Sequence, residues 1–533
     1  MYTTECKIGK IVKIEGLTIL VEVTEKNVAD KVLIKMGIGN YVVSINKFIY
    51  ASLPSCKRVI SRITKIIDRS LFYEQNIFSD NSNDKILIEA DLVGIYDDIT
   101  KKFDYGINTF PIIGSEIFAL NNEIYETMLC NSTNYLLEVG RSYNDSNISI
   151  YANPDILFGK HLGVFGNTGT GKTCTVASII QGLKRRIKCC NNISVNLSPK
   201  IIILDSNNEY STAFSSSDYK VRIIEKEELN LPHYNLSFTE YYKFLGASQG
   251  VQAPVLKEAI NGLKDKYGKF KLIDLPTKIE DVITKRSNNN NFSFNQWYGW
   301  CSTLINRIDK IVEDERISNI IDSSVVPDTV QQIINSDDEI FIINADFDKD
   351  ELDVIMFLFS KLLFKYAARM RDENQRCNLL VLFEEAHRYI NEEDSEEYKL
   401  GNLYIERLAR EGRKYGIGLI ISSQRPSELS KTVLSQCNSF IIHRITNKND
   451  LEFVNKVLSL NNQGLLKYIS GLEKQYAVAL GEAFSYSDII KICTADPRPR
   501  SDDPEVINNW VDRFEANNNG EKELFEEIAA VLE

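Results

Sequence analysis

An eight-residue stretch at positions 166–173, GNTGTGKT, constrains the fold of this 533-residue chain more than any other segment. It fits the pattern G-x-x-x-x-G-K-[ST] at every position, follows the apolar run LGVF and precedes a run typical of a helix. Glycines let such a turn wrap closely around a phosphate, while backbone N–H groups and the helix N-terminus supply positive charge. A chance match is expected in about 2% of chains of this length. We therefore predict a strand, a phosphate-binding loop and a helix at this point.

The side chains at the end of this loop indicate which chemistry it serves. Lys172 is expected to reach the β- and γ-phosphates of ATP, and Thr173 to bind Mg²⁺ through its hydroxyl. We expect the nucleotide to be held by nine consecutive residues: Gly166, Asn167, Thr168, Gly169, Thr170, Gly171, Lys172, Thr173 and Cys174.

Two adjacent carboxylates end the apolar run in LLVLFEEAHRYI, residues 379–390. Carboxylates are rarely buried without a partner, so a buried strand that ends this way needs a cation or a proton nearby. Ligands gather at the carboxyl ends of strands in open α/β sheets, which places this strand end beside the phosphate loop. We assign Glu384 to Mg²⁺, through water, and Glu385 to polarising the attacking water. The phosphate loop upstream favours this assignment over a merely solvated strand end.

Two further polar segments each have a functional and a structural interpretation. In GIGLIISSQRP, Gln424 either senses the γ-phosphate at the same sheet edge or ends a strand before Pro426. In ERLAREGRKYG, Arg410 and Arg413 would reach the γ-phosphate of a neighbouring subunit. Alternatively, Glu406 and Arg410 form an i,i+4 pair, and the cations suit a helix C-terminus. The residues alone leave these alternatives open.

The pattern along the chain predicts an α/β protein built from several segments. Short runs up to about residue 145, such as TILVEV and KILIEADLVGIY, are typical of a small antiparallel barrel. Apolar strands separated by helices follow, which indicates a parallel sheet buried on both faces. The expected segments are 1–147 (barrel), 148–225 and 338–490 (two parts of one α/β core), 226–337 (helical insertion) and 491–533 (C-terminal brace and tail).

Net charge and cysteine content indicate which ligands and which cell compartment the protein is suited to. The net charge of −12 argues against a general basic coat for nucleic acid, although it is compatible with a basic channel inside an assembly. The ten cysteines form no C-x-x-C pair and the four histidines lie far apart in sequence, so a zinc site is not expected. Scattered thiols suit a reducing compartment, and no apolar run approaches the ~20 residues that cross a bilayer. We expect a cytoplasmic protein with no membrane contact.

Five segments, in this order, resemble the HerA branch of the HerA–FtsK superfamily: GNTGTGKT, ILDSNNEY, LLVLFEEAHRYI, LAREGRKYGIGLIISSQRP and ADPRPRSDDP. The N-terminal region also resembles the family's barrel, most clearly in DYGINTFPIIGSEIFAL. The resemblance implies a RecA-like P-loop ATPase core with an N-terminal small β-barrel and a helical insertion. It further implies a homo-hexamer that hydrolyses ATP to move double-stranded DNA through the channel of the ring.

The resemblance also implies roles for single residues. It matches Glu385 to the family's catalytic glutamate and Gln424 to its sensor, and it places trans-acting arginines at the two positions named above. Asp205 and Glu209 match a D-x-x-x-E-Y element beside the active site. The segment PRPRSDDP resembles a brace that reaches the nucleotide of an adjacent subunit. Glu384 departs from the pattern, because many P-loop ATPases have Asp there and a longer arm must reach Mg²⁺.

No second catalytic motif is present in the sequence, so an effector protein is expected to act together with a DNA motor. HerA-like rings work with nucleases and, in bacterial antiphage systems, with sirtuin-like NAD-consuming proteins. The Asn-, Ile- and Lys-rich composition favours the defence setting. We expect the effector to dock on the N-terminal barrel. The alternative is an ATP-gated ring scaffold that restrains an effector without productive translocation. A small-molecule kinase is disfavoured, because it has no use for the barrel.

Overall fold

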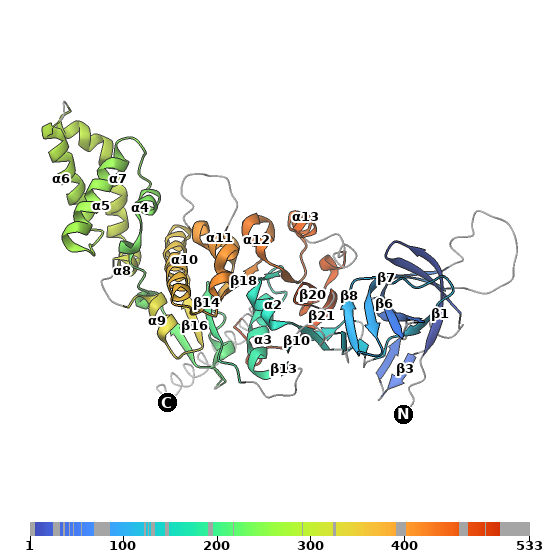
Figure 1. Ribbon diagram of the computed structural model, residues 1–533. Helices are drawn as coiled ribbons and strands as arrows, with labels where there is room; N and C mark the ends of the chain where they lie inside the picture. Colours follow the sequence, from blue (N-terminus) through green and yellow to red (C-terminus); the bar gives the residue numbers. More distant parts are fainter. Residues whose placement is uncertain are drawn as a thin grey trace, which may run out of the picture.

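The computed structural model (Figure 1) describes most of the chain between residues 6 and 500. Within this range the description leaves out residues 25–31, 36–37, 42, 46, 55, 69–85, 122–123, 126, 129–133, 144–148, 190–195, 217, 290–291, 323–326, 391–400, 458–466 and 485–486. The part of the expected C-terminal brace and tail that follows residue 500 lies outside the described residues.

The N-terminal region forms a closed antiparallel barrel. Its six strands pair in the order β2-β1-β9-β5-β6-β7, and β7 pairs again with β2. These strands are β1 (Lys7–Glu15), β2 (Thr18–Val23), β5 (Phe48–Leu53), β6 (Lys57–Asp68), β7 (Ile86–Asp97) and β9 (Glu116–Ala119). Strand β8 (Lys102–Tyr105) extends the sheet from β7, while β3 (Val32–Lys35) and β4 (Ile38–Tyr41) form a separate hairpin. Closure leaves the barrel without a free edge among these six strands, and the predicted barrel is confirmed.

The core is one long sheet, with strand order β11-β10-β21-β20-β19-β12-β18-β17-β14-β16-β15 and with β13 paired to β10. The strands are β10 (Tyr135–Ser142), β11 (Ser149–Ala152), β12 (Leu162–Phe165), β13 (Ile187–Cys189), β14 (Lys200–Asp205), β15 (Val221–Ile224), β16 (Ile340–Asn344), β17 (Leu379–Phe383), β18 (Ile417–Ser423), β19 (Ser439–Ile442), β20 (Tyr476–Gly481) and β21 (Asp488–Ile492). From β15 to β19 all neighbours are parallel, and from β19 to β11 they are antiparallel.

The parallel strands read as continuous apolar runs because both faces of the sheet are covered. Ile202 and Leu204 of β14 pack into the hydrophobic core on one face, whereas Ile201 and Ile203 pack into the core on the other. Successive side chains of a strand point to opposite faces, so each of these residues finds an apolar environment. The predicted doubly covered parallel sheet is confirmed.

Helices cover the sheet and extend it at one end. Those of the core are α2 (Pro154–Gly159), α3 (Lys172–Arg185), α10 (Lys349–Asp372), α11 (Gly401–Glu411), α12 (Lys431–Gln436) and α13 (Lys448–Val457). The insertion contains α4 (Phe238–Phe244), α5 (Gln252–Tyr267), α6 (Asp274–Asn289), α7 (Phe294–Glu313), α8 (Glu315–Ile321) and α9 (Thr329–Asn335). In Figure 1 the helical insertion and the barrel lie at opposite ends of the molecule, with the sheet between them.

Local sequence explains where these helices begin and which face they bury. Ser293 and Gln296 form a capping box at the start of α7, which satisfies backbone N–H groups that have no partner within the helix. Trp297, Cys301 and Leu304 then follow at helical spacing and are buried. Among the described helices, none combines the length and the apolar character needed to cross a bilayer.

Candidate active site

The phosphate loop has the expected context of strand, glycine turn and helix. It leaves β12 at Phe165 and enters α3 at Lys172. A Cβ on Gly166 would lie 2.5 Å from the Cβ of His443, so only glycine fits there. Gly171 has φ = 107°, a left-handed conformation that L side chains rarely adopt. These two glycines let the backbone turn sharply, and the first N–H groups of α3 are left for an anion.

The buried residue His443 supports the phosphate loop through hydrogen bonds. Its Nδ1–H donates to the carbonyl of Tyr476 (3.1 Å), which leaves Nε2 of His443 to accept from the Thr175 hydroxyl at 2.9 Å. Burial, together with the charge of Lys172, lowers the pKa of His443 to about 3. The imidazole is therefore neutral at physiological pH and holds the first turn of α3 against β19 and β20.

A cavity of about 280 Å³ opens beside the loop. The predicted nucleotide-binding residues that line it are Thr168, Gly169, Gly171, Lys172, Thr173 and Cys174. Asn167 supports them from the side, because its carbonyl accepts from Lys172 Nζ at 3.3 Å and from the Thr170 hydroxyl at 2.7 Å. Burial lowers the pKa of Lys172, and nearby carboxylates, Glu385 first, oppose this effect. The cavity thus offers a cationic floor of the kind that binds the phosphates of a nucleoside triphosphate.

Four neighbouring strands deliver polar side chains to this cavity from their carboxyl ends. In the sheet, β12 lies next to β18, β18 next to β17, and β17 next to β14. The phosphate loop follows β12, Gln424 follows β18, Glu385 closely follows β17, and Glu209 follows β14. All of them line the cavity. Parallel pairing explains why residues so distant in sequence meet at one sheet edge.

Glu385 and Gln424 are hydrogen-bonded to each other, as a water-polarising carboxylate and a sensor would be. The Gln424 amide donates to Oε1 of Glu385, and its own oxygen accepts from the Thr168 hydroxyl. Oε2 of Glu385 is buried, accepts no hydrogen bond from the described residues and lies 3.3 Å from Nδ1 of His387. Glu385 has φ = 44°, an uncommon conformation for a residue with a side chain. Such strain is typical of functional sites.

Glu384 does not line the cavity, unlike its neighbour Glu385. Its side chain is 2% exposed and accepts a hydrogen bond from the buried Tyr210 hydroxyl at 2.8 Å. Burial, and then the charge of Glu385, raises the pKa of Glu384 to about 8. The carboxylate beside Thr173 is instead Glu209, whose Oε2 accepts from the threonine hydroxyl at 2.7 Å. The hydrogen bond from Tyr210 occupies one oxygen of Glu384, and the expected role of Glu384 towards Mg²⁺ through water stays a prediction.

Arg410 and Arg413 do not line the cavity of their own chain. Arg410 lies in α11 and Arg413 in the turn that follows it, and both are exposed. The guanidinium of Arg413 donates to the carbonyl of Gln436 at 2.9 Å and to Oδ1 of Asn438. Any contact of these arginines with a phosphate would have to be made in another subunit.

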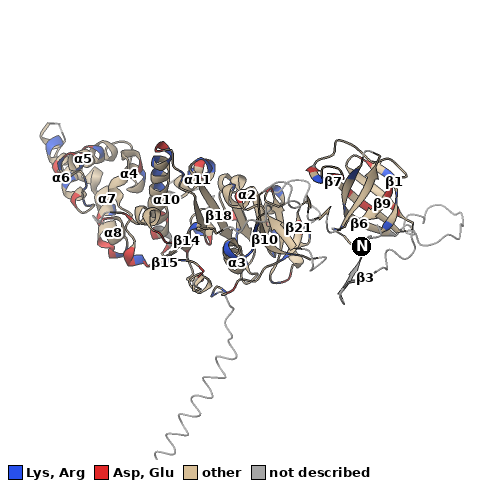
Figure 2. Cartoon of the chain, turned by 60° about the horizontal axis from the view of Figure 1, so that its bottom comes forward, with Lys and Arg blue, Asp and Glu red and all other residues tan. Residues whose placement is uncertain are grey.

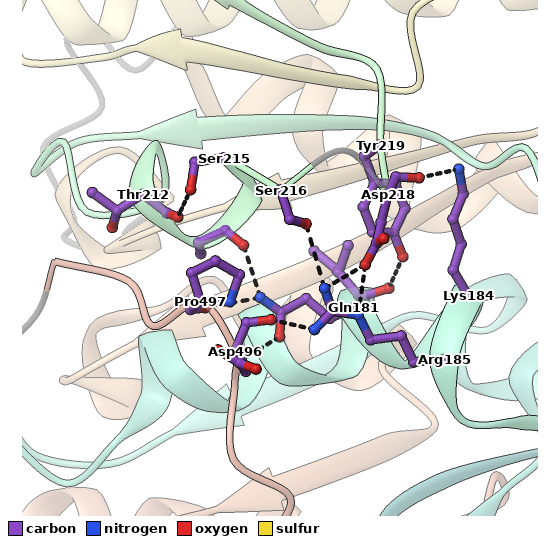
Figure 3. Close-up of polar contacts among 12 residues, drawn as sticks. Gln181, Lys184, Arg185, Thr212, Ser215, Ser216, Asp218, Tyr219, Asp496 and Pro497 are labelled. Carbon is purple, nitrogen blue, oxygen red and sulfur yellow. Dashed lines mark hydrogen bonds and ion pairs between the residues drawn. The ribbon is translucent and has the colours of Figure 1, made fainter.

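A C-terminal strap, defined here as residues 494–500, closes the other side of the cavity. Gln181 of α3 is buried and holds it: its amide donates to the carbonyls of Ala213 (2.8 Å) and Pro497 (2.9 Å), and its oxygen accepts from the N–H of Asp496 (2.8 Å). Figure 3 shows Gln181 between the strap and the segment that contains Thr212 and Tyr219. The strap is thus fixed to its own chain.

The strap brings to the cavity cations that are not among the predicted site residues. Arg498 and Arg500 line it, and so does Lys474, which precedes β20. The run PRPR is the sequence signal for these arginines, and its resemblance to a family brace predicts contact with the nucleotide of an adjacent subunit. In this structure its arginines face the nucleotide cavity of the same chain, because Gln181 and Arg185 hold Asp496 and Pro497 against α3.

Comparisons with known proteins agree with this geometry. Residues 137–337 match the family described as Helicase HerA, central domain. The probable helicase MJ1565 of Methanocaldococcus jannaschii is 24% identical over 448 residues, which cover 82% of each chain. The DNA double-strand break repair helicase HerA of Sulfolobus acidocaldarius is 26% identical over 417 residues, or 75% of this chain and 77% of the relative.

Among solved structures, VirB4 of Thermoanaerobacter pseudethanolicus is similar at a TM-score of 0.48, with 12% identity and coverage of 67% of this chain and 96% of that chain. The phosphate loop, the glutamate–glutamine pair at the sheet edge and the match to the HerA central domain together identify this chain as a HerA-like ATPase of the translocase/helicase type.

Proposed function

We propose that this ATPase acts as a closed ring of six copies that moves double-stranded DNA through its channel. The proposal rests on where the predicted catalytic residues lie. Glu385 lines the cavity of its own chain, whereas Arg410 and Arg413 lie outside it on exposed surface. Arginines in such positions can complete the site of a neighbour, as arginine fingers do. A site shared in this way needs a head-to-tail interface, and such interfaces form a ring when the rotation between subunits closes. The relatives named above are described as helicases, which supports DNA as the substrate.

The residues of the cavity fit an Mg²⁺ ion bound together with ATP. Mg²⁺ prefers oxygen ligands, and the Thr173 hydroxyl lies at the cavity wall next to the carboxylate of Glu209. When bound, the ion would neutralise charge that develops on the β- and γ-phosphates. Lys172 would contribute to the same task from the floor of the loop.

Glu385 is placed to activate the attacking water. Its Oε2 is buried and has no hydrogen-bond donor among the described residues, so it is available to accept a proton from a water molecule. Gln424 holds the other oxygen, Oε1, and reaches back to Thr168 of the phosphate loop. A movement of the phosphate loop when the γ-phosphate is lost would therefore change the position of Glu385 through the side-chain amide of Gln424.

A duplex-dependent ATPase assay separates the motor from the ATP-gated scaffold. A motor should hydrolyse ATP faster when duplex DNA is added and should displace the third strand of a triplex ahead of it. Glu385→Gln is the control, since it should bind ATP and DNA without displacing the strand. An ATPase rate that is indifferent to duplex DNA, with no displacement, would favour the scaffold. Mass photometry that shows an active monomer would contradict the ring.

We further propose that an effector protein docks on the barrel, for which an exposed apolar loop provides support. Phe110, Ile112 and Ile113, between β8 and β9, are 48%, 73% and 66% exposed. Large apolar side chains gathered on one surface are typical of protein interaction sites. Replacing Ile112 and Ile113 by Asp should abolish co-purification with the product of the neighbouring gene. Ile99→Asp, at another exposed position of the barrel, is the matched control; equal capture by both variants would place the docking site elsewhere.

The most specific part of the proposal is the biological role. We propose that the chain acts in a bacterial antiphage system, with a nuclease or a sirtuin-like NAD-consuming protein as the effector. It rests on composition and on the resemblance to bacterial HerA rings. Cells that express this chain with its neighbour should resist phage, and Lys172→Ala should remove the resistance. Unchanged plaque numbers in the presence of both wild-type proteins would contradict the defence role while leaving the motor proposal intact.

A further inference from the structure

We propose that His387 is a positioning residue for Glu385, the water-activating carboxylate. Its Nδ1–H is directed at Oε2 of Glu385 while the amide of Gln424 holds Oε1, so that the carboxylate is fixed from both sides. This inference rests on the proposed role of Glu385 in ATP hydrolysis and adds a residue to the predicted site. The backbone turn after β17, the neighbours of the imidazole and its protonation state support it.

The backbone turn after β17 brings the imidazole to the carboxylate. Glu385 adopts a left-handed conformation (φ = 44°, ψ = 46°), and a short 3₁₀ helix, Ala386–Arg388, follows it. The carbonyl of Glu385 accepts from the N–H of Arg388 at 2.9 Å, which closes the turn. His387 therefore lies back beside the side chain of Glu385. Such a left-handed conformation costs free energy in a residue with a side chain, and strain of this kind is typical of functional sites.

The neighbours of the imidazole determine which ring nitrogen carries the hydrogen. Nδ1 of His387 lies 3.3 Å from Oε2 of Glu385 and 3.2 Å from the hydroxyl oxygen of Ser423. Ser423 is the last residue of β18, which lies at the centre of the molecule between the insertion and the barrel (Figure 2). An ionised carboxylate only accepts hydrogen bonds, so an Nδ1 without hydrogen would direct its lone pair at those of Oε2.

The hydroxyl of Ser423 is compatible with a hydrogen on Nδ1. Its oxygen accepts from the N–H of Arg425 at 3.0 Å and has a second lone pair for the imidazole. We therefore assign the hydrogen of His387 to Nδ1, where it is shared between Ser423 and Glu385. Ser423 thus anchors the imidazole to the end of β18, next to the strand that carries the carboxylate.

The protonation state of His387 keeps the carboxylate reactive. Burial lowers the pKa of His387 below its ordinary value near 6.5; the charges of Glu385 and Glu428 oppose this effect, whereas those of Arg425 and Lys172 add to it. The imidazole is therefore neutral at physiological pH. A full positive charge beside Oε2 would make the carboxylate a weaker base, whereas an N–H dipole orients it with less loss of basicity. Because the contact of 3.3 Å is longer than a normal hydrogen bond, lone pairs of Oε2 stay available to water.

Two substitutions of similar shape test the positioning role, with kcat and KM measured separately on the full chain. His387→Asn retains an N–H group close to the position of Nδ1, whereas His387→Leu has no donor. His387→Leu should lower kcat by about 10- to 100-fold and change KM little, because a misplacement of about 1 Å costs rate to this extent. His387→Asn should recover most of this loss. A wild-type kcat in His387→Leu, or equal losses in the two variants, would overturn the proposal.

The Glu385→Gln background shows whether His387 acts through Glu385. In single-turnover hydrolysis, His387→Leu should slow Glu385→Gln little further, since the base that it positions is already lost. A further loss of about 10-fold or more in the double variant would mean that His387 acts on another group, and would overturn the proposal. A wild-type rate in Glu385→Gln alone would remove the proposed role of Glu385 and this inference with it. A slow Glu385→Gln together with a wild-type His387→Leu would overturn only the role of His387.

His233→Asn is the control for loss of a buried imidazole. Nδ1 of His233 lies 2.8 Å from the hydroxyl oxygen of Tyr241 and Nε2 lies 3.0 Å from the carboxylate of Asp322, both in the helical insertion. His233 does not line the nucleotide cavity. This variant should lower the unfolding temperature while kcat per folded chain stays at the wild-type value. If His233→Asn lost as much kcat as His387→Leu, destabilisation alone would explain the loss and the positioning role would be wrong.

Discussion

Gln424 donates a hydrogen bond from its side-chain amide to Oε1 of Glu385, so that the residue after β18 holds the residue after β17 at the edge of the nucleotide cavity. The other carboxylate oxygen of Glu385 is left for water. In the proposed mechanism this pair forms the hydrolytic centre, so these two residues are the first to substitute.

Glu385→Gln should bind ATP with near wild-type affinity and hydrolyse it about 10²- to 10⁴-fold more slowly, because the amide cannot take a proton from water. Gln424→Ala should give a smaller loss, since Glu385 keeps its charge and loses only its orientation. ATP turnover and equilibrium binding, measured on the same preparations, check both statements. Hydrolysis by Glu385→Gln at the wild-type rate would mean that another group activates the water.

Arg413→Ala should abolish turnover in uniform rings without weakening nucleotide binding by the same chain, because this arginine lies outside the cavity of its own subunit. Lys172→Ala should also be inactive, since the phosphates lose their cation. Mixing the two variants should restore part of the activity, as some interfaces then combine an intact phosphate loop with an intact arginine. Lys414→Ala, also exposed, is the control and should be active alone. No recovery at any mixing ratio would argue against a shared site.

Gln181→Leu should loosen the strap and weaken ATP binding. The leucine cannot pair with the N–H of Asp496 or with the two carbonyls that the amide now serves, and unpaired buried groups cost about 1 to 3 kcal/mol each. Arg498→Ala and Arg500→Ala should lower ATP affinity with little change in the unfolding temperature, because they remove the cations without releasing the strap. Thermal unfolding and ATP titration distinguish the two effects. If Gln181→Leu bound ATP with wild-type affinity, the strap would not contribute to the nucleotide site.

Glu240 of α4 should make stability depend on pH. Burial raises the pKa of Glu240, but hydrogen bonds from Lys361, Ser237 and Tyr404 outweigh this and lower it to about 2, from an ordinary value near 4.5. A depressed pKa contributes stability above about pH 4.5, and this contribution is lost as the pH falls towards 2.

Glu240→Gln should therefore destabilise the chain by about 3 kcal/mol at pH 7, where a buried partner of Lys361 is lost, and by less at pH 3. Unfolding by urea at several pH values measures the difference. Glu373→Gln, at an exposed i,i+4 pair on α10, should show almost no change at either pH.

The sequence by itself determined the parts of this protein that depend on short-range chemistry. The eight residues of the phosphate loop require a glycine turn between a strand and a helix whatever surrounds them, and the capping box at Ser293 marks the start of α7 in the same way. Apolar runs such as LLVLF identify strands covered on both faces, because no polar face is left for solvent. The closed barrel and the ATPase core were predictable on these grounds.

Only the tertiary structure decided which carboxylate faces the nucleotide cavity and where the C-terminal arginines lie. Glu384 and Glu385 are neighbours with the same chemistry, and the choice between them depends on Tyr210, which packs against one of them from another strand's loop. The strap reaches the cavity through contacts between Gln181 and residues 315 and 316 positions away. Such contacts exist only after the sheet has assembled, because hydrogen bonds between distant residues are set by the packing of whole elements and leave no local pattern in the chain.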